Sequence, residues 1–76
     1  MKTLTVKLET IDSVKKFNYL ATRQNFDIDI VSGRYNVDAK SLMGIFSLNL
    51  MEPIKVVLHT DDKEKIAEIE KELSNL

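Results

Sequence analysis

The chain has 76 residues, 43% of them hydrophobic and 30% charged, and a net charge of −1. This length predicts one domain, residues 1–76, near the lower limit of what a hydrophobic core alone can stabilise. The absence of cysteine excludes disulfides and thiolate metal sites, and the balanced charge offers no basic stripe for nucleic acid.

The N-terminal third predicts a strand followed by a helix. Thr3–Leu8 alternates polar and apolar residues, which is typical of a half-buried strand and unlike the apolar core of a signal peptide. Asp12 or Ser13 is expected to cap a helix that runs to about Gln24. The buried stripe of this helix is expected to contain Val14, Phe17, Leu20 and Ala21.

The middle of the chain predicts a β-hairpin. Phe26–Val31 alternates again and predicts a second strand, in which Asp27 and Asp29 are expected to point to solvent. Ser32-Gly33 is a tight-turn signal, and a short third strand, Arg34–Val37, follows it. Because this third strand is an exposed edge containing Tyr35, it is compatible with dimerisation.

The next segment predicts a short helix and a fourth strand. The helix is expected to span about Leu42–Leu48 and to be capped by Ser41, a contribution of about 1 kcal/mol. Asn49 is expected to end it in the left-handed conformation. Pro53 prevents any helical continuation, so Ile54–His59 predicts the last strand.

A C-terminal helix completes the order βαββαβα. Asp61 is expected to cap it, with Glu64 completing a capping box. Its expected buried stripe is Ile66, Ile69, Leu73 and Leu76. Each helix has a single apolar stripe to bury, so this order favours an α+β fold: a four-stranded antiparallel sheet with three helices on one face. No apolar run approaches the ~20 residues that span a bilayer, so no membrane insertion is expected.

The segment Ala39–Leu48 carries the most specific signal in the chain. Its serine follows a lysine, precedes an apolar run and lies three residues before a glycine. This segment resembles the one around the regulatory serine of HPr, the small histidine-containing phosphocarrier of the bacterial sugar phosphotransferase system. The resemblance extends to the element order of the whole chain and is specific in its residues from Gly33 to about Leu50. It implies an HPr-like open-faced sandwich and a cytoplasmic protein.

The residue that carries the phosphoryl group in HPr has no counterpart here. HPr proteins carry it on a histidine in an early Gly-x-His-x-Arg-Pro motif, whereas the corresponding stretch, Glu9–Lys16, contains no histidine, arginine or proline. Counting back from Phe26 places the family's histidine position at Asp12 or Ser13. The chain is therefore interpreted as a regulatory or partner-binding relative of HPr, with no catalytic residue and no cofactor.

The resemblance also implies a regulatory site and a docking surface. It makes Ser41 the phosphorylation site of an HPr kinase. It further assigns partner binding to four residues around this serine, Lys40, Leu42, Met43 and Phe46. The short helix cannot easily bury all its apolar residues, and an exposed cluster of Met and Phe is typical of a docking surface. The implied partners are proteins: HPr kinase, phosphotransferase enzymes or a LacI-type regulator.

Two alternatives remain open at this point. Asp12 is the only reasonable non-histidine phosphoryl acceptor, with Lys15 or Lys16 offering positive charge, whereas a phosphate on Ser13 would be too stable to pass on. The other alternative is a divergent interaction module that kept only the fold. His59, the sole histidine, is expected at a strand end ~20 Å from the first helix, and it makes neither a carrier nor a convincing metal site.

Overall fold

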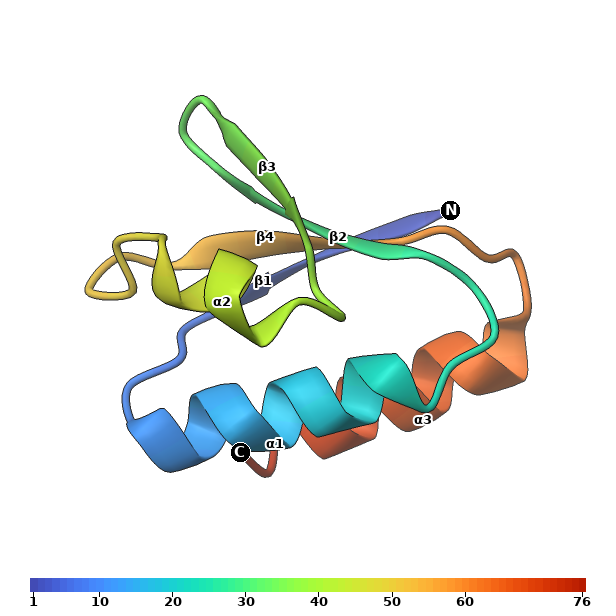
Figure 1. Ribbon diagram of the computed structural model, residues 1–76. Helices are drawn as coiled ribbons and strands as arrows, with labels where there is room; N and C mark the ends of the chain where they lie inside the picture. Colours follow the sequence, from blue (N-terminus) through green and yellow to red (C-terminus); the bar gives the residue numbers. More distant parts are fainter.

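Four strands and three helices follow one another in the order that the sequence predicts, βαββαβα. The computed structural model describes all 76 residues (Figure 1). The elements are β1 Lys2–Val6, α1 Ile11–Thr22, β2 Ile28–Ser32, β3 Tyr35–Asp38, α2 Leu42–Phe46, β4 Ile54–Leu58 and α3 Lys63–Leu73. The predicted α+β fold is confirmed. The strand ends differ from the expected ones by one or two residues, because ladder pairing rather than the polar–apolar pattern decides where a strand stops.

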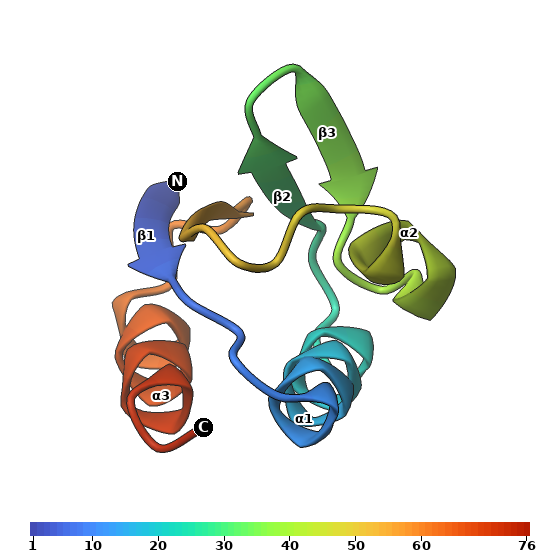
Figure 2. The ribbon, with the colours of Figure 1, turned by 90° about the vertical axis from the view of Figure 1, so that its left-hand side faces the viewer.

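The sheet has the strand order β1-β4-β2-β3, and every neighbouring pair is antiparallel. Alternation places Ile28 and Ile30 of β2 and Ile54, Val56 and Leu58 of β4 on the buried face. In Figure 2, α1 and α3 lie side by side beneath this face, and α2 lies below the end of β3. The opposite face of the sheet carries no helix, which makes the fold an open-faced sandwich.

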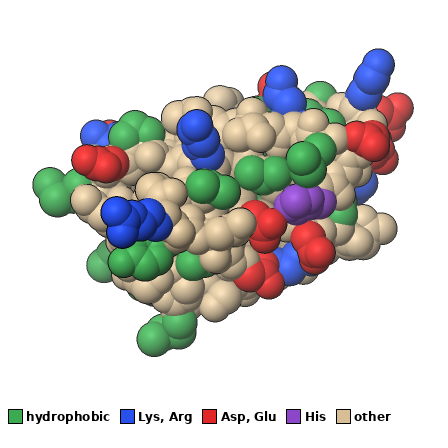
Figure 3. Space-filling view, turned by 90° about the horizontal axis from the view of Figure 1, so that it is seen from above, with side chains coloured by type: hydrophobic (Ala, Val, Ile, Leu, Met, Phe, Trp, Pro, Cys, Tyr) green, Lys and Arg blue, Asp and Glu red, His purple; other side chains and the backbone are tan.

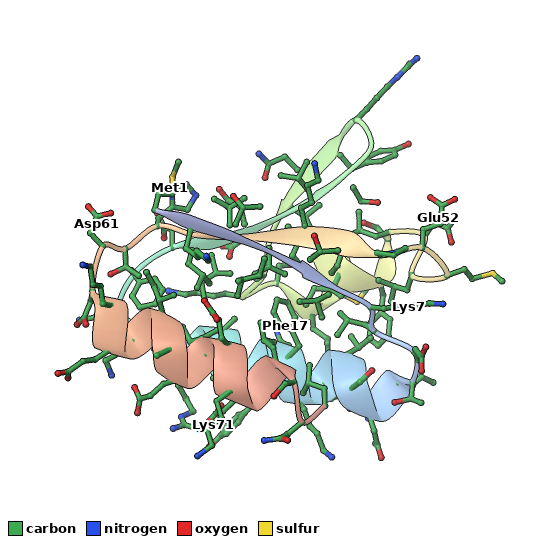
Figure 4. The ribbon with its side chains drawn as sticks, turned by 180° about the vertical axis from the view of Figure 1, so that it is seen from behind. Met1, Lys7, Phe17, Glu52, Asp61 and Lys71 are labelled. Atoms are coloured by element: carbon green, nitrogen blue, oxygen red, sulfur yellow. The ribbon has the colours of Figure 1, made fainter.

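The core is centred on α1 and the two inner strands. Phe17 is fully buried and points from α1 into the layer between helices and sheet (Figure 4). Val14, Leu20 and Ala21 are buried with it, so the predicted stripe of α1 is confirmed. Their spacing of three and four residues keeps one face of the helix against the sheet.

The predicted caps of the two long helices were wrong by one to three residues. Thr10 caps α1: its Oγ1 accepts from the Ser13 N–H at 3.0 Å, and the Ser13 Oγ accepts from the Thr10 N–H at 3.1 Å. This reciprocal box satisfies two groups at once, and it therefore wins over a cap at Asp12 or Ser13. Asp62 rather than Asp61 caps α3, accepting from two backbone N–H groups, those of Glu64 and Lys65.

Asp61 is instead paired with the α-amino group of Met1 across the start of β1 (Figure 4). This contact joins two segments separated by 60 positions in the chain. The amine, through its hydrogen bond and its charge, lowers the pKa of the Asp61 carboxyl below its usual value. Sequence spacing contains no signal for such a contact.

Two expectations about the C-terminal ends of helices α2 and α3 were also wrong. Asn49 does not adopt a left-handed conformation; α2 ends at Ser47, whose Oγ donates to the Gly44 carbonyl at 2.6 Å. Leu76 lies beyond the end of α3 and is exposed, whereas Ile69 is buried. A helix whose last turn is satisfied by a serine side chain does not need a left-handed residue.

The one residue with positive φ is Gly33, at 58°. It lies in the two-residue turn that joins the paired residues Ser32 and Tyr35. A glycine at the first central position with positive φ, followed by a residue with negative φ, is the pattern of a type II′ hairpin turn, which matches the twist of the flanking strands. The predicted tight turn is thus confirmed.

Candidate functional site

Exposed apolar side chains gather where β1 leads into α1 and where α2 leads into β4. An open groove of about 580 Å³ lies between these segments. Its apolar lining consists of Leu8, Ile11, Val14, Phe46, Leu50 and Met51. Three polar residues, Lys7, Glu9 and Thr10, complete it. The groove brings the start of α1 and the end of α2 together, although they are some 35 positions apart in the sequence.

The candidate docking surface consists of the exposed apolar residues at this end of the molecule: Ile11, Met43, Phe46 and Met51. Their exposed fractions are 64%, 80%, 42% and 84%, respectively. Met43 and Phe46 are three residues apart and therefore share one side of α2. Sequence reasoning identified these two and missed Ile11 and Met51. The missed signal was an apolar residue in each of two places that usually carry polar ones, the first residue of a helix and a turn.

The other apolar residues of α2 serve the core. Ile45 and Leu48 are buried, as expected from their positions on the helix. Leu42 is half-buried and packs against the core cluster, so its side chain is shared between packing and surface. The exposed part of α2 is therefore narrower than the sequence suggested.

Ser41 caps α2 as predicted and is itself exposed. Its Oγ accepts from the Gly44 N–H at 3.2 Å. A Cβ at position 44 would lie 3.3 Å from this Oγ and 3.5 Å from the Cβ of Val37. Glycine therefore leaves space for the hydroxyl beside β3, which gives a packing reason for the glycine that follows the serine.

Two side chains hold the loop before Ser41 against α1. The Asn18 Nδ2 donates to the Ala39 carbonyl at 3.1 Å, and the Lys40 Nζ donates to the Gln24 carbonyl at 3.1 Å. The Lys40 amine thus lies at the carboxyl end of α1, where a positive charge is stabilised by the helix dipole. Lys40 therefore has a structural contact in addition to the partner-binding role predicted for it.

The two residues expected at the position of the family's histidine differ in accessibility. Asp12 is exposed in the first turn of α1. Ser13 is buried, and its Oγ donates to the Thr10 carbonyl at 2.7 Å while accepting from the Thr10 N–H. These bonds hold the Ser13 hydroxyl in the cap of α1, so Asp12 is the more accessible residue of the two.

His59 lies at the opposite end of the sheet from the start of α1. It follows Leu58, which pairs with Lys2 at the beginning of β1, whereas α1 follows the end of β1. The His59 Nε2 lies 2.7 Å from the Asp29 Oδ2, and the His59 N–H donates to the Asp27 carbonyl at 3.0 Å. In Figure 3, which shows the open face of the sheet, the one histidine lies among acidic side chains.

These contacts correct one expectation and agree with another. Asp27 is exposed as predicted, but Asp29 is half-buried and has His59 as its partner. The cross-strand approach of β2 and β4 produces this pair, and strand alternation alone does not reveal it. No group of three or more histidine or carboxylate side chains is arranged to hold a metal ion.

Comparison with known proteins identifies solved structures that share this architecture. No protein-family model and no curated protein sequence matches the chain. Among solved structures, it is similar to HPr-C-His from Thermoanaerobacter tengcongensis, with a TM-score of 0.79, 24% identity, and coverage of 99% of this chain and 93% of that one. The chain has the HPr fold. The phosphocarrier protein HPr from Bacillus anthracis str. Ames is also similar, with a TM-score of 0.67, 24% identity and 90% coverage of both chains.

The HPr fold confirms the resemblance inferred from Ala39–Leu48 at the level of architecture. It is built here with no histidine near the start of α1, where Ile11 and Asp12 are exposed and Thr10 and Ser13 form the cap. None of its helices is both long and apolar enough to cross a bilayer.

Proposed function

We propose that this protein is a regulatory, partner-binding relative of HPr in the phosphotransferase system rather than a histidine phosphocarrier. One combination of features carries the proposal. The chain has the HPr fold and an exposed apolar surface near the start of α1, but it has no histidine there. An HPr-like chain without the carrier residue can still bind proteins that recognise the fold. Such a protein would act in the cytosol.

Partner binding is assigned to the docking surface and to the neighbouring Lys40 and Leu42. Three large exposed side chains, Ile11, Phe46 and Met51, border an open groove whose lining is mostly apolar. A contiguous apolar patch of this kind is costly to leave in water and is typical of a protein-binding site. The charged residues Lys7 and Glu9 lie at its edge and would give orientation to a partner.

Regulation is assigned to phosphorylation of Ser41. Ser41 is exposed and caps α2 two residues before the exposed Met43. Phosphorylation would add about 1.5 to 2 negative charges beside an apolar surface and would change its complementarity to a partner. HPr kinase is the proposed enzyme, and a LacI-type regulator or a phosphotransferase enzyme is the proposed partner.

The phosphorylation is tested by the intact mass of the protein after incubation with ATP and an HPr kinase. We expect one phosphate on the wild-type protein and none on Ser41→Ala. Ser47→Ala is the matched control, because Ser47 is an exposed serine at the other end of the same helix and should not be needed. Equal phosphate gain by the Ser41→Ala variant would exclude Ser41 as the acceptor.

The docking surface is tested by binding to HPr kinase and to a LacI-type regulator. We expect the double variant Phe46→Ala/Met51→Ala to weaken binding about tenfold or more, because a few central apolar side chains contribute much of the binding free energy of an interface. Tyr19→Ala is the matched control: this aromatic side chain on α1 is 65% exposed and does not line the groove. Wild-type affinity in the double variant would exclude this surface.

An alternative function is favoured by one observation, the exposure of Asp12 in the first turn of α1. A carboxylate there is able to form an acyl phosphate, which is reactive enough to be passed on. Phosphate that is labile to acid or hydroxylamine and lost in Asp12→Asn would support a phosphocarrier. Absence of phosphate both with ATP and an HPr kinase and with phosphoenolpyruvate and the phosphotransferase enzymes would favour a divergent interaction module that kept only the fold.

A further inference from the structure

The β3 edge of the sheet is free. β3 is an edge strand, and the β2–β3 hairpin stands away from the helices in Figures 1 and 2, with only α2 near the end of β3. Tyr35, Asn36 and Asp38 are all exposed. An exposed edge strand offers backbone donors and acceptors to another strand.

The direction of these backbone groups follows from the ladder. The Ala39 N–H donates to the Ile28 carbonyl at 2.9 Å, so position 39 faces β2. Because hydrogen-bonding direction alternates along a strand, Tyr35 and Val37 also face β2, whereas Asn36 and Asp38 face outward. Asn36 makes no hydrogen bond outside the ladder, so its N–H and C=O are free to pair with another strand.

The charges along this edge are complementary to themselves. Arg34 precedes β3 and Asp38 ends it, and neither takes part in an ion pair within the chain. Within the chain Asp38 accepts two backbone hydrogen bonds, from the Lys40 N–H to its Oδ1 and from the Ser41 N–H to its carbonyl, each at 2.9 Å, so its Oδ2 is the oxygen left for an arginine. They are four residues apart, about 13 Å along an extended strand, and so cannot pair with each other. In an antiparallel pairing of two copies centred on Asn36, Arg34 of each copy lies opposite Asp38 of the other.

We propose that the β3 edge pairs with the β3 edge of a second copy of this chain, in an antiparallel two-fold register centred on Asn36. The register uses the outward N–H and C=O of Asn36, forms two Arg34–Asp38 ion pairs and places Tyr35 against Val37. An aromatic residue opposite a β-branched one is a favourable cross-strand pair. The two four-stranded sheets then form one continuous eight-stranded sheet.

The distribution of charge also favours a second copy of this chain as the partner, and β3 rather than β1 as the edge that it pairs with. Asp38 lies directly opposite Asp29 within the sheet, a like-charge pair that an arginine from a second copy would offset. The other edge strand, β1, begins with Lys2, is followed by Lys7 and contains no carboxylate, so two copies would repel there. A contact of one short strand is well below the ~800 Å² per partner of a stable interface, so the dimer is weak and concentration-dependent.

The association is measured by sedimentation equilibrium and by ¹H–¹⁵N spectra of the full chain between about 50 µM and 2 mM, a range suited to weak self-association. We expect a monomer–dimer equilibrium with concentration-dependent shifts confined to residues 34–38. Arg34→Glu and Asp38→Lys should each weaken it about tenfold or more, because each makes both ion pairs repulsive. Asp38→Lys also removes the carboxyl oxygen that accepts from the Lys40 N–H, so Arg34→Glu is the cleaner of the two variants. Arg34→Lys, which keeps the charge, is the matched control.

The decisive experiment is to mix the two charge variants. A pair made of one Arg34→Glu chain and one Asp38→Lys chain has both ion pairs attractive, so the mixture should associate although neither variant does alone. Asn36→Pro gives a separate test through the backbone: it removes only an outward N–H, which edge strands tolerate, and it should abolish association while leaving the circular dichroism spectrum unchanged. A protein that is monomeric at the highest concentration, or shifts that map to the docking surface instead, would overturn the proposal.

Discussion

At the scale of single residues, hydrogen bonds between neighbours decide where the helices begin. Thr10 and Ser13 satisfy each other's backbone N–H groups, and Asp62 satisfies two at the start of α3. Each arrangement competes with an adjacent residue that has the same chemistry, Asp12 in the first helix and Asp61 in the last. Residue type alone therefore locates a cap only to within a few positions. Neighbouring candidates have the same side-chain chemistry, and the backbone geometry that selects one of them depends on the fold.

Asp61 leads to a prediction about pH. Its pairing with the Met1 amine lowers its pKa in the folded protein, so the stabilisation is fully present above the unfolded value of about 3.8 and is lost as the pH falls through the lower folded pKa. The effect on stability should be small, because the carboxyl is fully exposed and screened by solvent. An NMR titration of the side-chain carboxyl should give an Asp61 midpoint below 3.8.

The control for this titration is the same protein with an acetylated N-terminus. Acetylation removes the positive charge of the amine, and the Asp61 midpoint should rise towards the usual aspartate value. An unchanged midpoint after acetylation would show that Met1 is not the cause of the shift.

At the scale of elements, α2 shows how one short helix serves three purposes. Ile45 anchors it in the core, Ser41 caps it, and Met43 and Phe46 remain exposed. With only five residues, it cannot be stable alone and depends on its contacts with α1 and β3. A change at Ser41 can therefore alter both the stability of the helix and the surface that it presents.

The capping role of Ser41 can be separated from its proposed regulatory role. Ser41→Ala should lower the free energy of unfolding by about 1 kcal/mol, because the Gly44 N–H loses its side-chain acceptor. Ser41→Asp should stay within a few tenths of a kcal/mol of the wild type, because aspartate caps as well as serine does. Urea denaturation of the three proteins measures both differences, and equal destabilisation by alanine and aspartate would contradict the capping account.

At the scale of the whole molecule, a small core makes each large side chain important. A domain of this size is expected to have a free energy of unfolding of about 4 to 11 kcal/mol. Phe17 is fully buried at the junction of α1 and the sheet. Removing it affects both layers of the sandwich.

Phe17→Ala should cost about 3 to 5 kcal/mol, through lost burial and the cavity that remains. The variant should therefore be largely unfolded at 37 °C or unfold well below the wild type, whereas Phe17→Leu should cost only about 1 to 2 kcal/mol and stay folded. Thermal denaturation followed by circular dichroism distinguishes the variants. A melting temperature of Phe17→Ala close to that of the wild type would contradict the central place of Phe17 in the core.

The sequence by itself determined the order of the helices and strands and the face that each of them buries. Val14, Phe17, Leu20 and Ala21 repeat at helical spacing, and Ile28 and Ile30 alternate as in a strand, because a short chain must place each apolar stripe against another. Ser41 was recognised as a cap by its position directly before an apolar run. These features are local, and a local pattern is enough to specify them.

Only the tertiary structure decided which distant residues meet. Ile11, Phe46 and Met51 line one groove. Asp29 on β2 is paired with His59, which follows β4, and Asp61 is paired with the Met1 amine. None of these contacts has a characteristic spacing, since each depends on how loops and strand ends are brought together by sheet register. The sequence predicted the fold and half of the exposed apolar residues of the proposed docking surface. The groove and the ion pairs arise from the packing of separate elements.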